Sequence, residues 1–309
     1  MTTHLALVGP TATGKSQLAL AAAAELGDIE ILSVDSMQVY RGMDIGTAKP
    51  SPAERAQVPH HLLDVADPGE DYSVARFAAA ATEAISAIEG RGHRALLVGG
   101  TGLYFQAVVD GLELPGEYPE VRNDLDERAR EPAGLEGLYR RLERLDPVAA
   151  ARIEPANQRR VVRALEVVVA TGRPFSSYGP GVFGAPGPGA LSVRTVGMWM
   201  PRAALARRIV DRFAAMADAG LVDEVTRLAN APAGMSRTAR AAIGYQEVVD
   251  HLEGRLATLA EAMARSVDRT RALSRRQRMW FRRDPRTTWI GVADKPLAAL
   301  GALLATWNT

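Results

Sequence analysis

The feature that most constrains the fold of this chain is a glycine-rich octapeptide near its start, GPTATGKS at residues 9–16. It matches the pattern G-x-x-x-x-G-K-[ST], whose backbone N–H groups turn inward around phosphate oxygens. A short apolar run precedes it at His4–Val8, and a helical pattern follows from Lys15 to about Leu26. This context predicts a strand, a phosphate loop and a helix whose positive N-terminal end faces an anion.

We therefore expect residues 9–16 (the phosphate loop) to bind a diphosphate or triphosphate. The predicted binding residues are Gly9, Pro10, Thr11, Ala12, Thr13, Gly14, Lys15 and Ser16. Lys15 is placed to neutralise a terminal phosphate, and the Ser16 hydroxyl is placed to ligate Mg²⁺, the expected cofactor. The motif leaves the reaction open, because an ATP-binding kinase, an NTPase and a prenyltransferase can all use this cradle.

The pattern of strands and helices predicts an α/β fold. Strand candidates lie at 4–8, 29–34, 95–98, 195–200 and 288–290, and helical segments separate them. Strands alternating with helices indicate a parallel sheet covered by helices on both faces. A mainly helical segment at 113–194 interrupts this pattern and ends in an irregular Gly/Pro-rich loop at 179–189. We expect a core made of 1–112 and 195–309, and an inserted helical domain at 113–194.

Composition and charge narrow the classes of function. The chain has no cysteine, which excludes disulfides and zinc–thiolate sites. It shows neither a secretory signal nor an apolar run of about 18 residues, so we expect a cytoplasmic protein that does not span a membrane. Residues 265–286 hold nine arginines and two aspartates although the net charge of the chain is only +1. This excess favours an anionic partner, although a solvated helix face is an alternative.

A carboxylate follows the second strand candidate, at Asp35. Ligands of parallel sheets bind beyond the carboxyl ends of the strands, so Asp35 is expected to face the phosphate loop. It could hold magnesium, accept a proton from a nucleophile, or only cap a helix. His60 and His61 are interpreted as structural, since adjacent positions do not converge easily on one metal ion. Core packing is favoured for Trp280, Phe281 and Trp289 over stacking on bases.

Seven further blocks follow the phosphate loop in order. They are 33–50, 60–64, 99–104, 160–167, 216–225, 243–247 and the positions Thr270-Arg271, Arg276-Gln277 and Trp280-Phe281. Together they resemble the bacterial tRNA dimethylallyltransferases, and the block SVDSMQVYRGMDIGTAKP at 33–50 is far more specific than the phosphate loop alone. One departure is Gln246, which stands where Lys or Arg often follows the Gly-Tyr pair.

The resemblance implies a prenyltransferase. Dimethylallyl diphosphate would bind with its diphosphate in the phosphate loop, and the acceptor would be N6 of the adenosine next to the anticodon on its 3′ side, position 37 of tRNA. By resemblance, Asp35 is the general base, Thr101 contacts the flipped nucleotide or its phosphate, and Lys15 and Arg208 act on the diphosphate. Arg207 and Arg212 lie close enough to Arg208 to blur that assignment. We expect a monomer.

The resemblance also marks residues expected to contact the tRNA anticodon stem-loop. They are Asp35, Ser36, Met37, Gln38, Thr101, Asn123, Arg159, Arg160, Val161, Val162, Arg163, Arg271, Arg275, Arg276 and Gln277. Three rivals remain open: a small-molecule kinase, a prenyltransferase acting on free adenine nucleotides, and an RNA-binding protein without chemistry. The insert at 113–194 and the arginine-rich C-terminal segment favour a polymeric acceptor.

Overall fold

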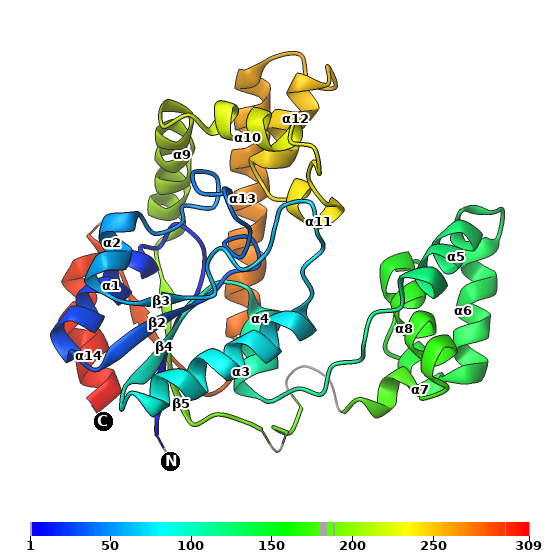
Figure 1. The fold of residues 1–309 in the computed structure, drawn as a ribbon, viewed down its shortest axis with the longest axis horizontal. Helices are drawn as coiled ribbons and strands as arrows, with labels where there is room; N and C mark the ends of the chain where they lie inside the picture. The colour runs from blue at the N-terminus through cyan, green and yellow to red at the C-terminus, as the bar shows by residue number, and fades with distance from the viewer. Residues whose placement is uncertain (1, 180–183, 188, 294, 309) are drawn as a thin grey trace. The chain divides into compact units, whose positions relative to one another are not determined.

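The computed structural model describes residues 2–179, 184–187, 189–293 and 295–308, which form two compact units (Figure 1). Unit 1 comprises Met1–Val109 and Leu191–Thr309, and unit 2 comprises Asp110–Ala190. Both junctions lie slightly before the boundaries expected at 113 and 195. Residues 180–183 and 188 of the Gly/Pro-rich loop lie outside the described residues.

Unit 1 is built on a six-stranded parallel sheet with the order β3-β2-β4-β1-β5-β6. The strands are β1 (His4–Val8), β2 (Ile29–Val34), β3 (His60–His61), β4 (Arg94–Gly99), β5 (Val193–Trp199) and β6 (Thr287–Gly291). The predicted α/β class is therefore confirmed. The sequence did not reveal β3 as a strand, because two residues are too few to show alternation.

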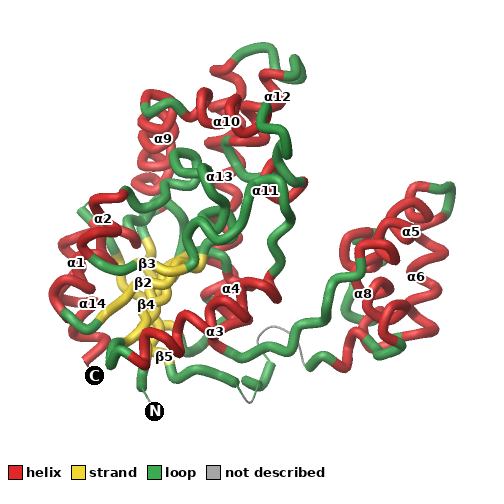
Figure 2. Tube along the Cα trace, in the orientation of Figure 1, coloured by secondary structure: helices red, strands yellow, loops and turns green. Residues whose placement is uncertain are grey.

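Helices cover both faces of the sheet, as expected (Figures 1 and 2). One face packs on α1 (Lys15–Leu26) and α14 (Leu300–Asn308), and the other on α3 (Val74–Gly90) and α4 (Gly102–Val109). Side chains alternate between faces along β1: Leu5 and Leu7 join the cluster with α1, whereas Ala6 and Val8 join the cluster with α3. A strand that is buried on both faces has a continuous apolar sequence, as β1 does.

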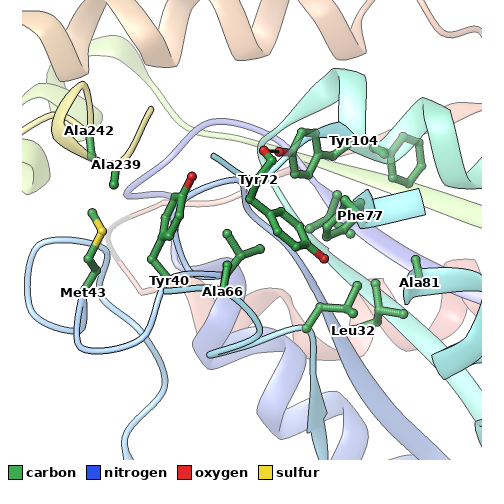
Figure 3. Close-up of a cluster of buried hydrophobic side chains, with 14 of the residues drawn as sticks. Leu32, Tyr40, Met43, Ala66, Tyr72, Phe77, Ala81, Tyr104, Ala239 and Ala242 are labelled. Carbon is green, nitrogen blue, oxygen red and sulfur yellow. Dashed lines mark hydrogen bonds between the residues drawn. The ribbon is translucent and has the colours of Figure 1, made fainter. Parts of the chain in front are cut away.

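Further helices of unit 1 extend the core on the α3 side: α9 (Arg202–Asp218), α10 (Leu221–Ala229), α11 (Arg237–Arg240), α12 (Tyr245–Leu252) and α13 (Leu259–Phe281). Helix α2 (Pro52–Gln57) has no buried residue, and the 3₁₀ turn η2 (Pro296–Ala299), just before α14, packs on the α1 side. Figure 3 shows Tyr40 and Met43, from the loop after β2, beside Ala239 and Ala242. This loop is therefore part of the core.

Unit 2 is helical and has its own core. It contains α5 (Pro119–Arg130), α6 (Gly134–Leu145), α7 (Pro147–Ala150), α8 (Gln158–Thr171) and the 3₁₀ turn η1 (Phe175–Ser177). Leu125, Leu138, Leu142 and Leu165 form the centre of its apolar cluster. In the described parts of both units, no helix combines the length and apolar character needed to cross a membrane.

Candidate functional site

The carboxyl ends of β1, β2 and β4 surround a cavity of about 350 Å³. Because β4 lies between β1 and β2, its Gly99-Gly100 end separates the phosphate loop from Asp35. Lys15, Ser16 and Asp35 all line this cavity. The expected approach of Asp35 to the phosphate loop is therefore confirmed.

The phosphate loop takes a backbone path that only glycine accepts at two points. Gly9 has φ +133° and Gly14 has φ +89°, a region that L side chains rarely adopt. A Cβ atom on Gly9 would lie 2.6 Å from the carbonyl oxygen of Met198 in β5. The buried Thr13 hydroxyl donates to the Pro10 carbonyl at 2.9 Å and braces the turn from within. The glycine conformations and the Thr13 hydrogen bond thus hold the loop in one shape.

Lys15 folds back onto the loop that precedes it. Its Nζ donates to the carbonyl oxygens of Gly9 at 3.0 Å and Pro10 at 2.7 Å. Burial lowers the pKa of Lys15 to about 7, while the negative charge of Asp35 acts in the opposite direction. An ammonium group with so low a pKa gains much from an arriving phosphate, because the anion replaces the lost hydration.

Two arginines of α9 reach the same loop. Arg208 Nε donates to the Ala12 carbonyl at 2.9 Å, and Arg212 Nη1 donates to the Thr11 hydroxyl at 3.3 Å. Both line the cavity, whereas Arg207 is exposed. Burial lowers the pKa of Arg212, and Asp35 partly offsets this effect. Sequence analysis left Arg212 outside the predicted site, although its spacing of four from Arg208 places both on one helix face.

Asp35 and Thr101 are held by the backbone of the turn that follows β2. Asp35 Oδ1 accepts a hydrogen bond from Met37 N at 2.8 Å, and Thr101 Oγ1 accepts one from Ser36 N at 3.2 Å. Residues 36–39 form a turn and not a helix, so Asp35 caps a turn while it lines the cavity. The predicted alternative of a helix cap is therefore wrong in detail, because the carboxylate caps a turn and also lines the cavity.

Two glutamines predicted to contact tRNA brace the cavity from inside. The Gln38 side chain donates to the carbonyls of Thr47 and Ala48, both at 3.2 Å, and accepts from the Ser33 hydroxyl at 2.7 Å. Gln277 Oε1 accepts from Thr11 N at 2.8 Å, across 266 positions of sequence. Sequence reasoning missed this bracing, because nothing local to either glutamine names its partner.

The predicted tRNA contacts of unit 2 divide into exposed and buried residues. Asn123, Arg159 and Arg160 are exposed on α5 and α8. Arg163 donates to Glu166 at 2.7 Å and to the Gly116 carbonyl at 3.0 Å, both within the unit. Val161 and Val162 are a correction: they are 0% and 1% exposed and pack in the core of the unit, so their side chains cannot meet RNA.

The helix α13 carries most of the arginine-rich segment. Arg275 and Arg276 are exposed, while Arg271 is half-buried and donates to Asp268 at 2.9 Å. Phe281 is buried against Phe105, with ring centroids 5.7 Å apart. Trp280 and Trp289 pack partly buried against the same cluster. The core interpretation of these three aromatic residues is therefore confirmed.

The adjacent histidines have structural partners, as expected. His61 Nε2 lies 2.7 Å from a carboxylate oxygen of the buried Glu30, and His60 Nδ1 lies 2.7 Å from the Val58 carbonyl. Arg91 and His93 also contact Glu30. Within the described residues, no three His, Asp or Glu side chains gather as a set that could hold a metal ion.

Comparisons with known proteins converge on one family. A family model described as IPP transferase matches residues 38–284, and one described as isopentenyl transferase matches residues 1–65. A tRNA dimethylallyltransferase of Roseiflexus castenholzii is 48% identical over 294 residues, covering 94% of this chain and 93% of that protein. The one from Geobacter metallireducens is 46% identical, with coverages of 99% and 98%.

Solved structures agree. A full-length tRNA isopentenylpyrophosphate transferase from Bacillus halodurans is 36% identical and aligns with a TM-score of 0.70 over 100% of this chain and 97% of its own. A eukaryotic dimethylallyltransferase acting on tRNA aligns with a TM-score of 0.78 at 25% identity, over 100% of this chain and 76% of its own.

Proposed function

Because this chain belongs to the tRNA dimethylallyltransferase family, we propose that the cavity beside the phosphate loop is its active site. The enzyme transfers a dimethylallyl group from dimethylallyl diphosphate to N6 of the adenosine at position 37 of tRNA. The bond from C1 to the diphosphate oxygen breaks, a C–N bond forms, and diphosphate and N6-(dimethylallyl)adenosine leave. One observation carries the proposal for the site: Asp35 and Lys15 line the same cavity.

The donor diphosphate would bind in the phosphate loop. The amides of residues 9–16 and the N-terminal end of α1 supply oriented dipoles, and Lys15, Arg208 and Arg212 supply positive charge. Lys15 would exchange its bonds to the Gly9 and Pro10 carbonyls for phosphate oxygens. Since these groups are in place before the reaction, they stabilise the charge that grows on the leaving diphosphate.

Ser16 and the diphosphate would together hold Mg²⁺. Ser16 lies in the first turn of α1 and lines the cavity next to Lys15. Magnesium in phosphate sites commonly takes one or two protein ligands, substrate oxygens and waters, so a hydroxyl donor at this place fits. When bound, the ion would neutralise part of the charge on the diphosphate.

Asp35 would accept the proton of the acceptor amine. The lone pair of an adenine amine is shared with the ring, so the amine is a poor nucleophile. A carboxylate cannot deprotonate it in advance, since the ordinary pKa of Asp is near 4. The proton leaves as the C–N bond forms and the nitrogen becomes cationic, and a nearby carboxylate can then take it. The bond from Met37 N to Oδ1 holds the carboxylate in its orientation.

The acceptor would be an anticodon stem-loop with its adenosine turned out of the stack. Exposed arginines fit such a partner: Arg275 and Arg276 on α13, and Arg159 and Arg160 with Asn123 in unit 2. We further propose that Thr101, whose hydroxyl accepts a hydrogen bond from Ser36 N beside Asp35, contacts the flipped nucleotide, and that the enzyme acts in the cytoplasm as a monomer.

Product analysis tests the proposal. The enzyme is incubated with dimethylallyl diphosphate, Mg²⁺ and an anticodon stem-loop, and nucleosides are then examined by mass spectrometry. We expect N6-(dimethylallyl)adenosine with the stem-loop and none with AMP. Asp35→Asn, which keeps the acceptor for Met37 N, should abolish transfer while stem-loop binding persists. ATP turnover with a small acceptor, or full activity of the Asn variant, would refute the assignment.

A further inference from the structure

One buried carboxylate anchors the loop that forms part of the cavity wall. Glu224, on α10, is 6% exposed. Its Oε2 accepts hydrogen bonds from Asp44 N at 3.0 Å and Ile45 N at 2.9 Å, and its Oε1 accepts one from Gly46 N at 3.2 Å. Three successive amides of the loop after β2 thus converge on a residue about 180 positions away.

Tyr245, at the start of α12, completes this anchor. Its hydroxyl donates to Glu224 Oε1 at 2.5 Å, and its side chain is fully buried. Burial, and then the charge of Glu224, raise the pKa of Tyr245 far above its ordinary value, so the hydroxyl remains a donor. A Cβ atom on Gly46 would lie 2.3 Å from the Tyr245 ring, which shows how closely the loop packs on it.

The anchored residues 44–46 are followed in the chain by residues that line the cavity. Thr47 and Ala48 follow Gly46, and their carbonyls accept the two hydrogen bonds of the Gln38 amide at 3.2 Å. Gln38, Thr47 and Ala48 line the cavity together with Asp35. The position of this wall therefore depends on contacts that Glu224 and Tyr245 make outside the cavity.

We propose that Glu224 and Tyr245 are positioning residues for the transfer reaction: they fix the loop 44–48, and through Gln38 the turn that carries Asp35. This inference rests on the proposed function of the cavity. Neither residue lines the cavity, so neither touches a reacting atom. Small displacements of a base from its acceptor geometry slow a reaction strongly, by up to about 10²-fold for 1 Å.

The inference predicts a loss of rate without a loss of donor affinity. The phosphate loop is braced from elsewhere, by Gln277 of α13 and by Arg208 and Arg212 of α9. Loosening the loop 44–48 should therefore leave the diphosphate cradle intact. A structural defect of the whole unit would instead weaken donor binding and thermal stability together with the rate.

Tyr245→Phe is the test variant, because it removes one hydroxyl and keeps the ring. We expect the single-turnover rate at saturating donor and stem-loop to fall about tenfold in this variant. In Glu224→Gln it should fall about 10²-fold, because the side-chain NH₂ group replaces one acceptor oxygen and cannot accept from the backbone N–H groups. The Kd for dimethylallyl diphosphate, measured by calorimetry, should stay within about twofold of wild type. Tyr139→Phe, which removes a hydroxyl bond of 3.0 Å to Ala150 O in unit 2, is the matched control and should keep full rate.

Two outcomes overturn the inference. One is that the two single variants, Tyr245→Phe and Glu224→Gln, both fold and both keep the wild-type single-turnover rate. The other is a rate that falls only in proportion to donor affinity and melting temperature. The proposed function fails separately, if the wild-type enzyme makes no prenylated adenosine with the same stem-loop.

Discussion

Raising the pH from 7 to 9 should weaken the binding of dimethylallyl diphosphate, because Lys15 then loses its proton in the ligand-free enzyme. Its pKa is lowered from 10.5 to about 7 by burial. A bound diphosphate should raise this pKa again, since it pairs with the ammonium. About half of the free enzyme carries the proton at pH 7 and about 1% at pH 9, so the affinity should fall about fiftyfold.

Calorimetry with donor and a fixed Mg²⁺ concentration, without tRNA, measures this effect. At pH 8, Lys15 is deprotonated in about 90% of the free enzyme, so donor binding should take up nearly one proton per molecule. This uptake is measured by comparing the binding enthalpy in buffers that differ in ionisation enthalpy. The phosphate groups themselves are ionised over this range. Lys15→Arg is the control, since guanidinium stays charged and its affinity should not vary with pH. An equal pH dependence in both proteins, or none in wild type, would refute the assignment.

Two further predictions concern RNA binding and stability. A double variant with Ala at both Arg275 and Arg276 should bind the stem-loop more weakly. If each arginine contacts one phosphate, the slope of log K against log salt concentration should become shallower by about 1.4. An unchanged slope in filter-binding measurements would contradict this prediction. Arg91, with His61 and His93, lowers the pKa of Glu30 from 4.5 to about 2. The stabilised carboxylate of Glu30 thereby contributes about 3 kcal/mol to the free energy of unfolding. This contribution is present above pH 5 and is lost as the pH falls to 2. Urea titrations of Glu30→Gln should lack that dependence, and a parallel loss in both proteins would contradict it.

The local parts of the fold and site could be predicted from the sequence alone. The strand His4–Val8, the turn with Gly9 and Gly14, and the helix Lys15–Leu26 have the predicted bounds. Their signals are apolar runs and turn residues, which act over a few neighbours. The place of Asp35 beside the loop also followed, because all strands of a parallel sheet point their carboxyl ends to one edge.

Contacts between distant segments were decided only by the tertiary structure. No local pattern indicates that Gln277 holds Thr11 N or that Glu224 gathers the amides of 44–46. The burial of Val161 and Val162 likewise depends on how α8 packs in unit 2. The physical reason is that such pairings arise from many weak contacts summed over the whole core, whereas a sequence window records only its own neighbours.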